Sequence, residues 1–281
     1  MGERIKLGGG RVRLTGRKLA LGAGDELAKL PARDVAAWYG RLADACEKNG
    51  MQLSAQLLRR WLLNRKPGMH VHLPAHEHLV RSQAVKEALA YHRRVFLTEE
   101  KARQTGRSPI WAGVLPRLEG SHDHAHWDGS GAIDMHYESL AGDESGFSVS
   151  LKARFGKMAI EDLDVFAALH GFQLRSDVWV HGAPLGKRRM RITFTEWKAS
   201  VSDTYHWDPD KRLTVPNPDY GSARPGAVRP DLDEITVYHG NAKRLEDQGM
   251  AGWFSYDTDE WNVSDPSISS PGDVDLDKDL D

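Results

Sequence analysis

The sequence predicts an α+β protein, with an N-terminal helical bundle followed by an antiparallel β-sheet or small sandwich that contains one or two embedded helices. Two periodicities lead to this prediction. Before residue 109, apolar residues recur every three or four positions, as on one face of a helix, whereas after it they recur at every second position, as on one face of a strand. The chain has 281 residues and is 40% hydrophobic and 28% charged, which is typical of a globular protein with a buried core.

The sequence of residues 1–33 indicates an irregular, basic lead-in segment. They contain three consecutive glycines at positions 8–10 and lack the apolar segment of a cleaved secretory signal, so we expect the protein in the cytoplasm of the producing cell. No apolar run along the chain approaches the ~18–20 residues that a bilayer-spanning helix needs, and no transmembrane segment is expected.

Residues 34–108 predict a helical region, because three apolar stripes recur at helical spacing. Asn49 and Gly50 are typical of the end of the first helix, and residues 66–79 predict a loop because they are interrupted by Pro67 and Pro74. Bundle core explains these stripes better than a ligand pocket does. The stripes are Val35, Trp38, Tyr39, Leu42 and Cys46; Leu53, Leu57 and Trp61; and Val85, Leu89, His92 and Phe96.

Residues 109–263 predict a β-rich region, in which residues 182–187 link two alternating runs as a hairpin and residues 209–230 form a long, proline-rich connection. Residues 264–281 hold six aspartates, one lysine and no aromatic residue, and predict a disordered acidic tail. The expected strands are 147–155, 177–181, 189–194, 201–207 and 235–239, and the expected helices are 160–170 and 241–248.

Charge is distributed unevenly along the chain. Residues 1–110 carry 21 Lys and Arg and 10 Asp and Glu, a charge of +11. Residues 111–281 carry 17 Lys and Arg and 30 Asp and Glu, a charge of −13, and the two sum to the net charge of −2. The basic N-terminal half suits an anionic partner such as nucleic acid, lipid headgroups or an acidic protein surface. Because the basic residues are dispersed, attraction between the two halves or a solvated surface explains them better.

The thirteen histidines are the most unusual feature of the composition, and seven of them form two clusters. In one cluster, His122, His124 and His126 are followed by Asp128. Alternate residues of a strand share a face, so these four side chains would offer ligands to a divalent metal, of which zinc is the most plausible. Such an ion lowers the pKa of its bound water and supplies a hydrolytic nucleophile.

The other histidine cluster offers a weaker metal site through His70 and His72, since Pro74 interrupts it. Two alternatives remain open for both clusters. Histidine-rich loops bind metals adventitiously, and clustered histidines form surfaces whose charge changes between about pH 5 and 8. Familiar catalytic motifs are missing from the sequence: no Gly-x-Ser-x-Gly elbow occurs, and Cys46 on an apolar helical face is expected to be a buried structural thiol.

The segment from Asp203 to Tyr220 predicts a rigid loop, because three prolines restrict its backbone and its carboxamide and carboxylate side chains can bond to nearby amides. Such a loop serves equally well as the platform of a binding site or as a structural clasp. The residues of this candidate binding loop are Asp203, Tyr205, Trp207, Asn217, Asp219 and Tyr220.

Two stretches of this loop, Asp-Thr-Tyr-His-Trp-Asp-Pro at 203–209 and Val-Pro-Asn-Pro-Asp-Tyr-Gly at 215–221, resemble an uncharacterised proteobacterial family found near type VI secretion genes. The resemblance covers mainly the C-terminal half and carries no established catalytic residues. It implies a secreted antibacterial effector or a protein encoded beside one. Export through a contractile apparatus needs no cleaved signal, and the implied partners are a secretion-system component or a cognate immunity protein.

Two functions follow as expectations. The first is an antibacterial effector of a type VI secretion system, working as a metal-assisted hydrolase on envelope, lipid or nucleic acid through the histidine clusters. The second is a non-catalytic binding protein of a secretion system, such as an adaptor, an immunity protein or a delivery partner. In the second, loop aromatics and the charge asymmetry form the contact. Whether the chain is an enzyme stays open, and a hydrolase is the expectation if it is one.

Overall fold

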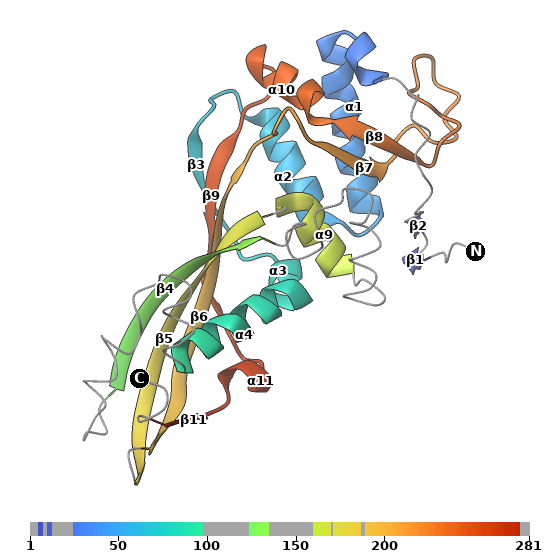
Figure 1. Cartoon of the computed structure of the whole chain (residues 1–281). Helices are drawn as coiled ribbons and strands as arrows, with labels where there is room; N and C mark the ends of the chain where they lie inside the picture. Colours follow the sequence, from blue (N-terminus) through green and yellow to red (C-terminus); the bar gives the residue numbers. More distant parts are fainter. Residues whose placement is uncertain are drawn as a thin grey trace. The chain divides into compact units, whose positions relative to one another are not determined.

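The structure is a computed structural model that describes residues 5–7, 10–12, 25–97, 124–134, 160–169, 171–186 and 189–275. It confirms the α+β class (Figure 1). The chain divides into two units, each assembled from separate stretches. The first unit comprises Met1–His72, Asp134–Gly171 and Asp203–Tyr256, and the second comprises Leu73–Ile133, Phe172–Ser202 and Asp257–Asp281.

The first unit is built on helices α1 (Ala32–Lys48) and α2 (Gln52–Leu63), which pack against each other. The apolar stripes predicted for both helices are buried, and burial raises the pKa of the Cys46 thiol to about 12. The first helix ends where Asn49 and Gly50 predict, because Gly50 takes a left-handed backbone with φ of 82° and lets the Met51 amide bond back to the Cys46 carbonyl.

Helix α9 (Ile160–Leu169) supplies the missing cap of α2. The first amides of a helix have no partner within it. The fully buried Asp164 carboxylate accepts from the Leu53 amide at 2.7 Å and from the Ser54 amide at 2.8 Å, and the Ser54 hydroxyl lies 2.6 Å from the same carboxylate. One side chain therefore joins two helices that lie about a hundred residues apart in the chain.

The remaining elements of the first unit include a hairpin of β7 (Arg212–Pro216) and β8 (Glu234–Tyr238), followed by α10 (His239–Asp247). Strands β1 (Ile5–Leu7) and β2 (Gly10–Val12) pair near the N-terminus. Arg244 of α10 donates to the carbonyls of Leu27, Ala28 and Leu30, and so holds the short 3-10 helix η1 (Leu27–Lys29).

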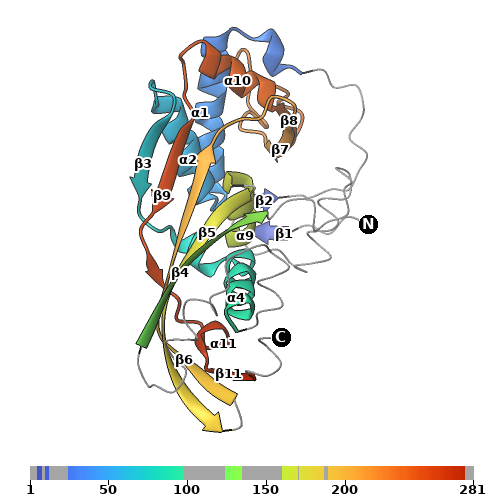
Figure 2. The same ribbon diagram turned by 60° about the vertical axis from the view of Figure 1, so that its left-hand side comes forward.

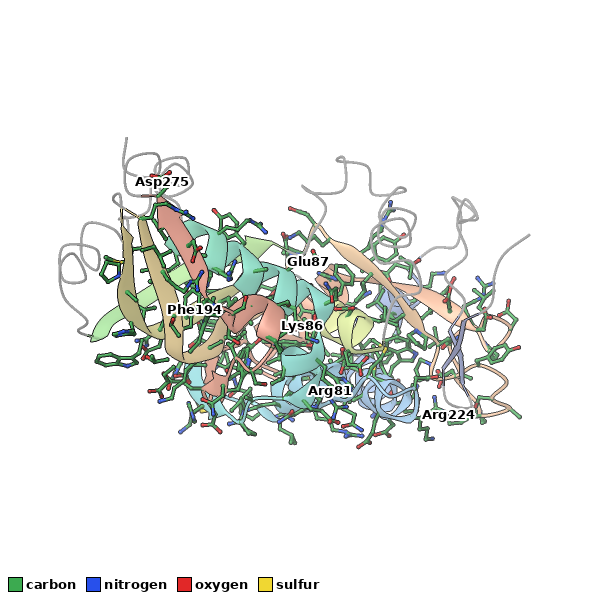
Figure 3. All side chains as sticks on the ribbon, turned by 90° about the horizontal axis from the view of Figure 1, so that it is seen from below. Arg81, Lys86, Glu87, Phe194, Arg224 and Asp275 are labelled. Atoms are coloured by element: carbon green, nitrogen blue, oxygen red, sulfur yellow. The ribbon has the colours of Figure 1, made fainter. Side chains whose placement is uncertain are left out.

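In the second unit, the long strands β5 (Gly171–Gly186) and β6 (Arg189–Tyr205) run antiparallel side by side (Figures 1 and 2). Helix α4 (Gln83–Leu97) packs on them: His92 Nδ1 lies 2.7 Å from the Ser176 hydroxyl, and Phe96 meets Phe194, which is labelled in Figure 3, at a centroid distance of 5.4 Å. Among the described residues the seven-stranded sheet has the strand order β3-β9-β6-β5-β4, with β10 and β11 also paired to β6, and most of β3 and β9 belongs to the first unit. The remaining elements are β3 (Met69–Leu73), α3 (Glu77–Arg81), β4 (His124–Asp134), β9 (Phe254–Thr258), β10 (Trp261–Asn262), α11 (Pro266–Ser269) and β11 (Gly272–Asp275).

Several boundaries predicted from the sequence are wrong. The expected loop at 66–79 contains β3 and the start of α3, because apolar Val71 and Leu73 alternate with exposed histidines and can pair as a strand. The lead-in forms β1, β2 and η1 rather than only irregular chain. The strands expected at 189–194 and 201–207 both fall on the single strand β6, which ends at Tyr205, and the connection expected at 209–230 contains strand β7.

The acidic tail is also ordered over residues 264–275. Strand β11 pairs with β6, and Asp273 accepts two bonds from the Arg191 guanidinium at 2.7 and 3.1 Å, so partner charge offsets the repulsion expected of an acidic segment. Val274 and Ile268 are buried and anchor it. The strand expected at 147–155 and the end of the tail at 276–281 lie outside the described residues.

Replacing Asp164 tests the cap between α9 and α2. We expect Asp164→Ala to lower the free energy of unfolding by about 2–4 kcal/mol, since it leaves two buried helix amides without an acceptor. Urea denaturation followed by circular dichroism measures this. Glu161→Ala, on the same helix, serves as the control and should change stability much less; equal losses in the two variants would contradict the capping role.

Candidate functional site

The loop between β7 and β8, residues 217–233, is closed by the side chain of Asn217. The Asn217 amide nitrogen donates toward three carbonyls of the returning chain, Val228 at 3.0 Å, Arg229 at 2.7 Å and Leu232 at 3.0 Å. Its side-chain oxygen accepts from the amide of Asp219 at 3.1 Å. Asparagine suits this position because it is the small side chain that carries both donors and an acceptor.

Asp219 ties the same loop to helix α1. Its carboxylate accepts two bonds from the Arg41 guanidinium, from Nε at 2.9 Å and from Nη2 at 3.1 Å. It also accepts from Arg224 Nη2 at 3.1 Å and from the Val228 amide at 2.8 Å. We refer to Arg41, Asn217, Asp219 and Arg224 as the clasp. A buried carboxylate is stable only when its oxygens are paired in this way.

The environment of Asp219 keeps its carboxylate ionised. Burial by itself raises the pKa, but the hydrogen bonds from Arg41 and from the Val228 amide, together with the charges of Arg41 and Arg224, outweigh burial and lower the pKa of Asp219 below its usual value. The clasp therefore stays charged at neutral pH, and its contribution to folding is lost only in acid, below the ordinary aspartate pKa.

The clasp leaves the outer part of the loop on the surface. The Tyr220 side chain, next to the buried Asp219, is 62% exposed, and Arg224 projects from the same loop (Figure 3). Arg229 has a φ of 47°, a left-handed conformation that is uncommon for a residue with a side chain, and its carbonyl is one of those that Asn217 holds. The conformation of the loop is therefore held by the hydrogen bonds of the clasp on its buried side.

The earlier part of the predicted binding loop has a different environment. Tyr205 and Trp207 belong to an aromatic cluster of the first unit, in which the Trp207 ring lies 5.6 Å from those of Tyr39 and Trp61. Tyr205 stacks on Phe254 at 5.5 Å with an interplanar angle of 18°. The cluster joins α1, α2 and β9 to the end of β6. It places Tyr205 and Trp207 in packing contacts, while Tyr220 remains exposed.

Asp203 has the most unusual acidity among the predicted residues. The half-buried carboxylate lies near Tyr256, whose hydroxyl has no hydrogen-bond partner among the described residues. Burial raises the pKa of Asp203 to about 7, and the weaker opposing influences are the Thr204 amide and the charge of His206. A carboxyl group with this pKa changes its charge near neutrality.

The structure places the predicted metal ligands in strands. His124, His126 and Asp128 lie in β4, and His122 lies outside the described residues. His70 and His72 lie at exposed positions of β3, where His70 Nδ1 is 3.1 Å from the Ser255 hydroxyl. Within the described stretches, no three His, Cys, Asp or Glu side chains gather in a way that would hold a metal ion. The metal site remains a prediction.

Sequence reasoning did not identify Arg41 or Arg224 as parts of the loop site. Arg41 lies on the polar side of α1, outside the apolar stripe that predicts this helix. It is also 178 residues away from Asp219 along the chain. The only available signal was the pair of residues Asn217 and Asp219 beside prolines, which indicated a rigid loop but not the cation that it binds.

Replacing Asp203 tests its raised pKa. Because the folded-state pKa of about 7 exceeds the unfolded value, the native state holds the proton longer, and stability should fall as pH rises from about 4 to about 7. Asp203→Asn should remove this part of the pH dependence. The quantity to compare is the difference in urea midpoint between variant and wild type at each pH in this range. Burial lowers the pKa of His239 to about 4, so His239 makes stability rise with pH, but it does so equally in both proteins. A constant difference would contradict the assignment.

No family model, curated protein or solved structure matches this chain. None of the helices in the described residues is both long and apolar enough to cross a membrane. Function therefore has to be inferred from the geometry of the chain's own residues, above all from the loop that the clasp holds.

Proposed function

We propose that this chain is a non-catalytic binding protein of a secretion system, acting as an adaptor, an immunity protein or a delivery partner. Loop 217–233 is its contact with a protein partner. The observation that carries the proposal is the clasp: a part-buried, bidentate ion pair, and an Asn217 amide nitrogen within hydrogen-bond distance of three carbonyls, hold a loop whose outer residues are exposed.

A loop held in this way is suited to binding. Association costs free energy for every segment that has to be ordered, and a loop already held in one conformation avoids much of that cost. Tyrosine and arginine are among the residue types enriched at energetic centres of protein interfaces. This loop exposes Tyr220, and Arg224 remains 44% exposed while it pairs with Asp219. The resemblance of residues 203–209 and 215–221 to proteins found near type VI secretion genes supports the setting.

Truncating Tyr220 tests this contact. The wild-type chain should retain a single stoichiometric partner from a lysate of its native bacterium, and Tyr220→Ala should weaken that complex by about 2 kcal/mol, roughly thirtyfold, since the aromatic anchor is lost. Asp219→Asn should weaken it as well, because it removes the charge that Arg41 and Arg224 hold. Affinity is measured by calorimetry with the purified partner.

The matched control for Tyr220 is Trp179→Ala, an aromatic side chain that is 40% exposed on β5 in the other unit. It should bind the partner as the wild type does. Equal affinity of Tyr220→Ala and wild type, or the absence of any stoichiometric partner, would refute the proposed contact.

A second candidate function is an exported antibacterial effector that uses a divalent metal for hydrolysis. One observation favours it: His124, His126 and Asp128 lie in a single strand, β4, and this is the local structure that the metal hypothesis requires. Zinc bound there would activate a water molecule for attack on an envelope, lipid or nucleic-acid substrate.

Metal content and growth together test the effector function. The purified wild type should contain about one equivalent of metal by mass spectrometry, and His124→Ala and His126→Ala should lose it. Expression in the bacterial cytoplasm, and separately with an added export signal, should arrest growth for the wild type but not for these variants. His181→Ala, on β5, is the matched control. A toxic protein without metal, or variants of unchanged toxicity, would refute this function.

A further inference from the structure

A second exposed surface of the first unit lies at the turn between α2 and β3, beside the residue that precedes β9. We call it the tip, and it consists of Leu63, Arg65, Lys66, Met69 and Trp253. Leu63 is the most exposed large apolar side chain of the described residues, at 77%, and Met69 and Trp253 are 38% and 36% exposed. A single exposed apolar side chain is ordinary, but several of them together on one surface are typical of a site that contacts a protein or a membrane.

The two segments of the tip form one surface because buried hydrogen bonds join them. The Asn64 side chain donates to the carbonyls of Gly252 at 3.0 Å and Trp253 at 3.1 Å, and the Gly68 amide donates to the Trp253 carbonyl at 3.0 Å. The Trp253 ring lies over Gly68, where a Cβ would come within 3.1 Å of it. Glycine therefore allows the indole to rest on the turn, and strands β3 and β9 continue from it side by side (Figures 1 and 2).

The charge of the tip is positive and lacks a compensating carboxylate. No Asp or Glu occurs between residues 51 and 76. The Arg65 guanidinium donates to the backbone carbonyls of Gly249 and Met250, which leaves its charge unneutralised, and in the described part of the chain no carboxylate pairs with Lys66. The acid at the end of neighbouring α10, Asp247, is engaged by Lys243 at 3.1 Å.

We propose that the tip docks on an anionic lipid surface. Arg65 and Lys66 would contact lipid phosphates, and Leu63, Met69 and Trp253 would enter the headgroup region. Peripheral proteins bind membranes through this combination, in which apolar side chains supply buried area and cations supply attraction to anionic lipid, and tryptophan favours the membrane–water interface. An acidic protein partner would pair with the cations but would not by itself account for the exposure of Leu63, which is 77%.

Co-sedimentation of the full chain with vesicles tests this proposal. The wild type should bind vesicles of phosphatidylglycerol and phosphatidylethanolamine, bind vesicles of phosphatidylcholine alone at least about tenfold less, and dissociate as salt rises from 50 to 500 mM. These salt concentrations bracket the physiological range, in which roughly 0.15 M salt already screens charges beyond about 8 Å. The double variant Leu63→Ser/Lys66→Glu should partition at least about tenfold less, since each cation near an anionic leaflet contributes roughly fivefold.

The matched control is Leu185→Ser/Lys48→Glu, which changes an exposed leucine and an exposed lysine elsewhere and should bind as the wild type does. Thermal unfolding verifies that all variants are folded, and the single variant Lys66→Glu, at an exposed turn residue, provides a folded alternative. Equal binding to neutral and anionic vesicles, unchanged binding of the tip variants, or binding to soluble polyglutamate but not to vesicles would overturn the proposal. Because Tyr220 lies outside the tip, Tyr220→Ala should leave vesicle binding unchanged.

Discussion

The ion pair between Arg41 and Asp219 is the interaction on which the site of this protein depends. It carries a loop of the β7–β8 hairpin to the polar side of α1, and both carboxylate oxygens are used. Without a paired cation, an aspartate that is almost fully buried would carry a large desolvation cost. The same carboxylate accepts from Val228, so the conformation of the backbone and the pairing of the charge depend on each other.

A second buried aspartate works on the same principle in the helical part of this unit. Asp164 accepts hydrogen bonds from the Leu53 and Ser54 amides at the start of α2, where the helix dipole favours negative charge. In both places a carboxylate from one segment satisfies groups of another that is distant in sequence. Packing of this kind explains how the first unit is assembled from three separate stretches of chain.

Two exposed surfaces of the first unit differ in chemistry. In loop 217–233 the carboxylates of Asp219 and Asp231 are paired with arginines, one of them Arg41 of α1, and the loop exposes the aromatic side chain of Tyr220. The tip at the α2–β3 turn holds uncompensated cations beside apolar side chains. The first suits a shape-specific protein contact, and the second suits a diffuse anionic surface.

Hydrophobic periodicity by itself determined the fold class, the apolar faces of α1 and α2, and the presence of α9, β8 and α10, because the spacing of side chains follows directly from local backbone geometry. It also marked Asn217 and Asp219 as members of a rigid loop. Only the tertiary structure decided that Arg41 would hold that loop, that 69–73 would pair as a strand, and that the acidic segment 272–275 would be ordered by Arg191. Long-range ion pairs and strand pairing depend on where the chain returns, and sequence spacing alone does not specify that path.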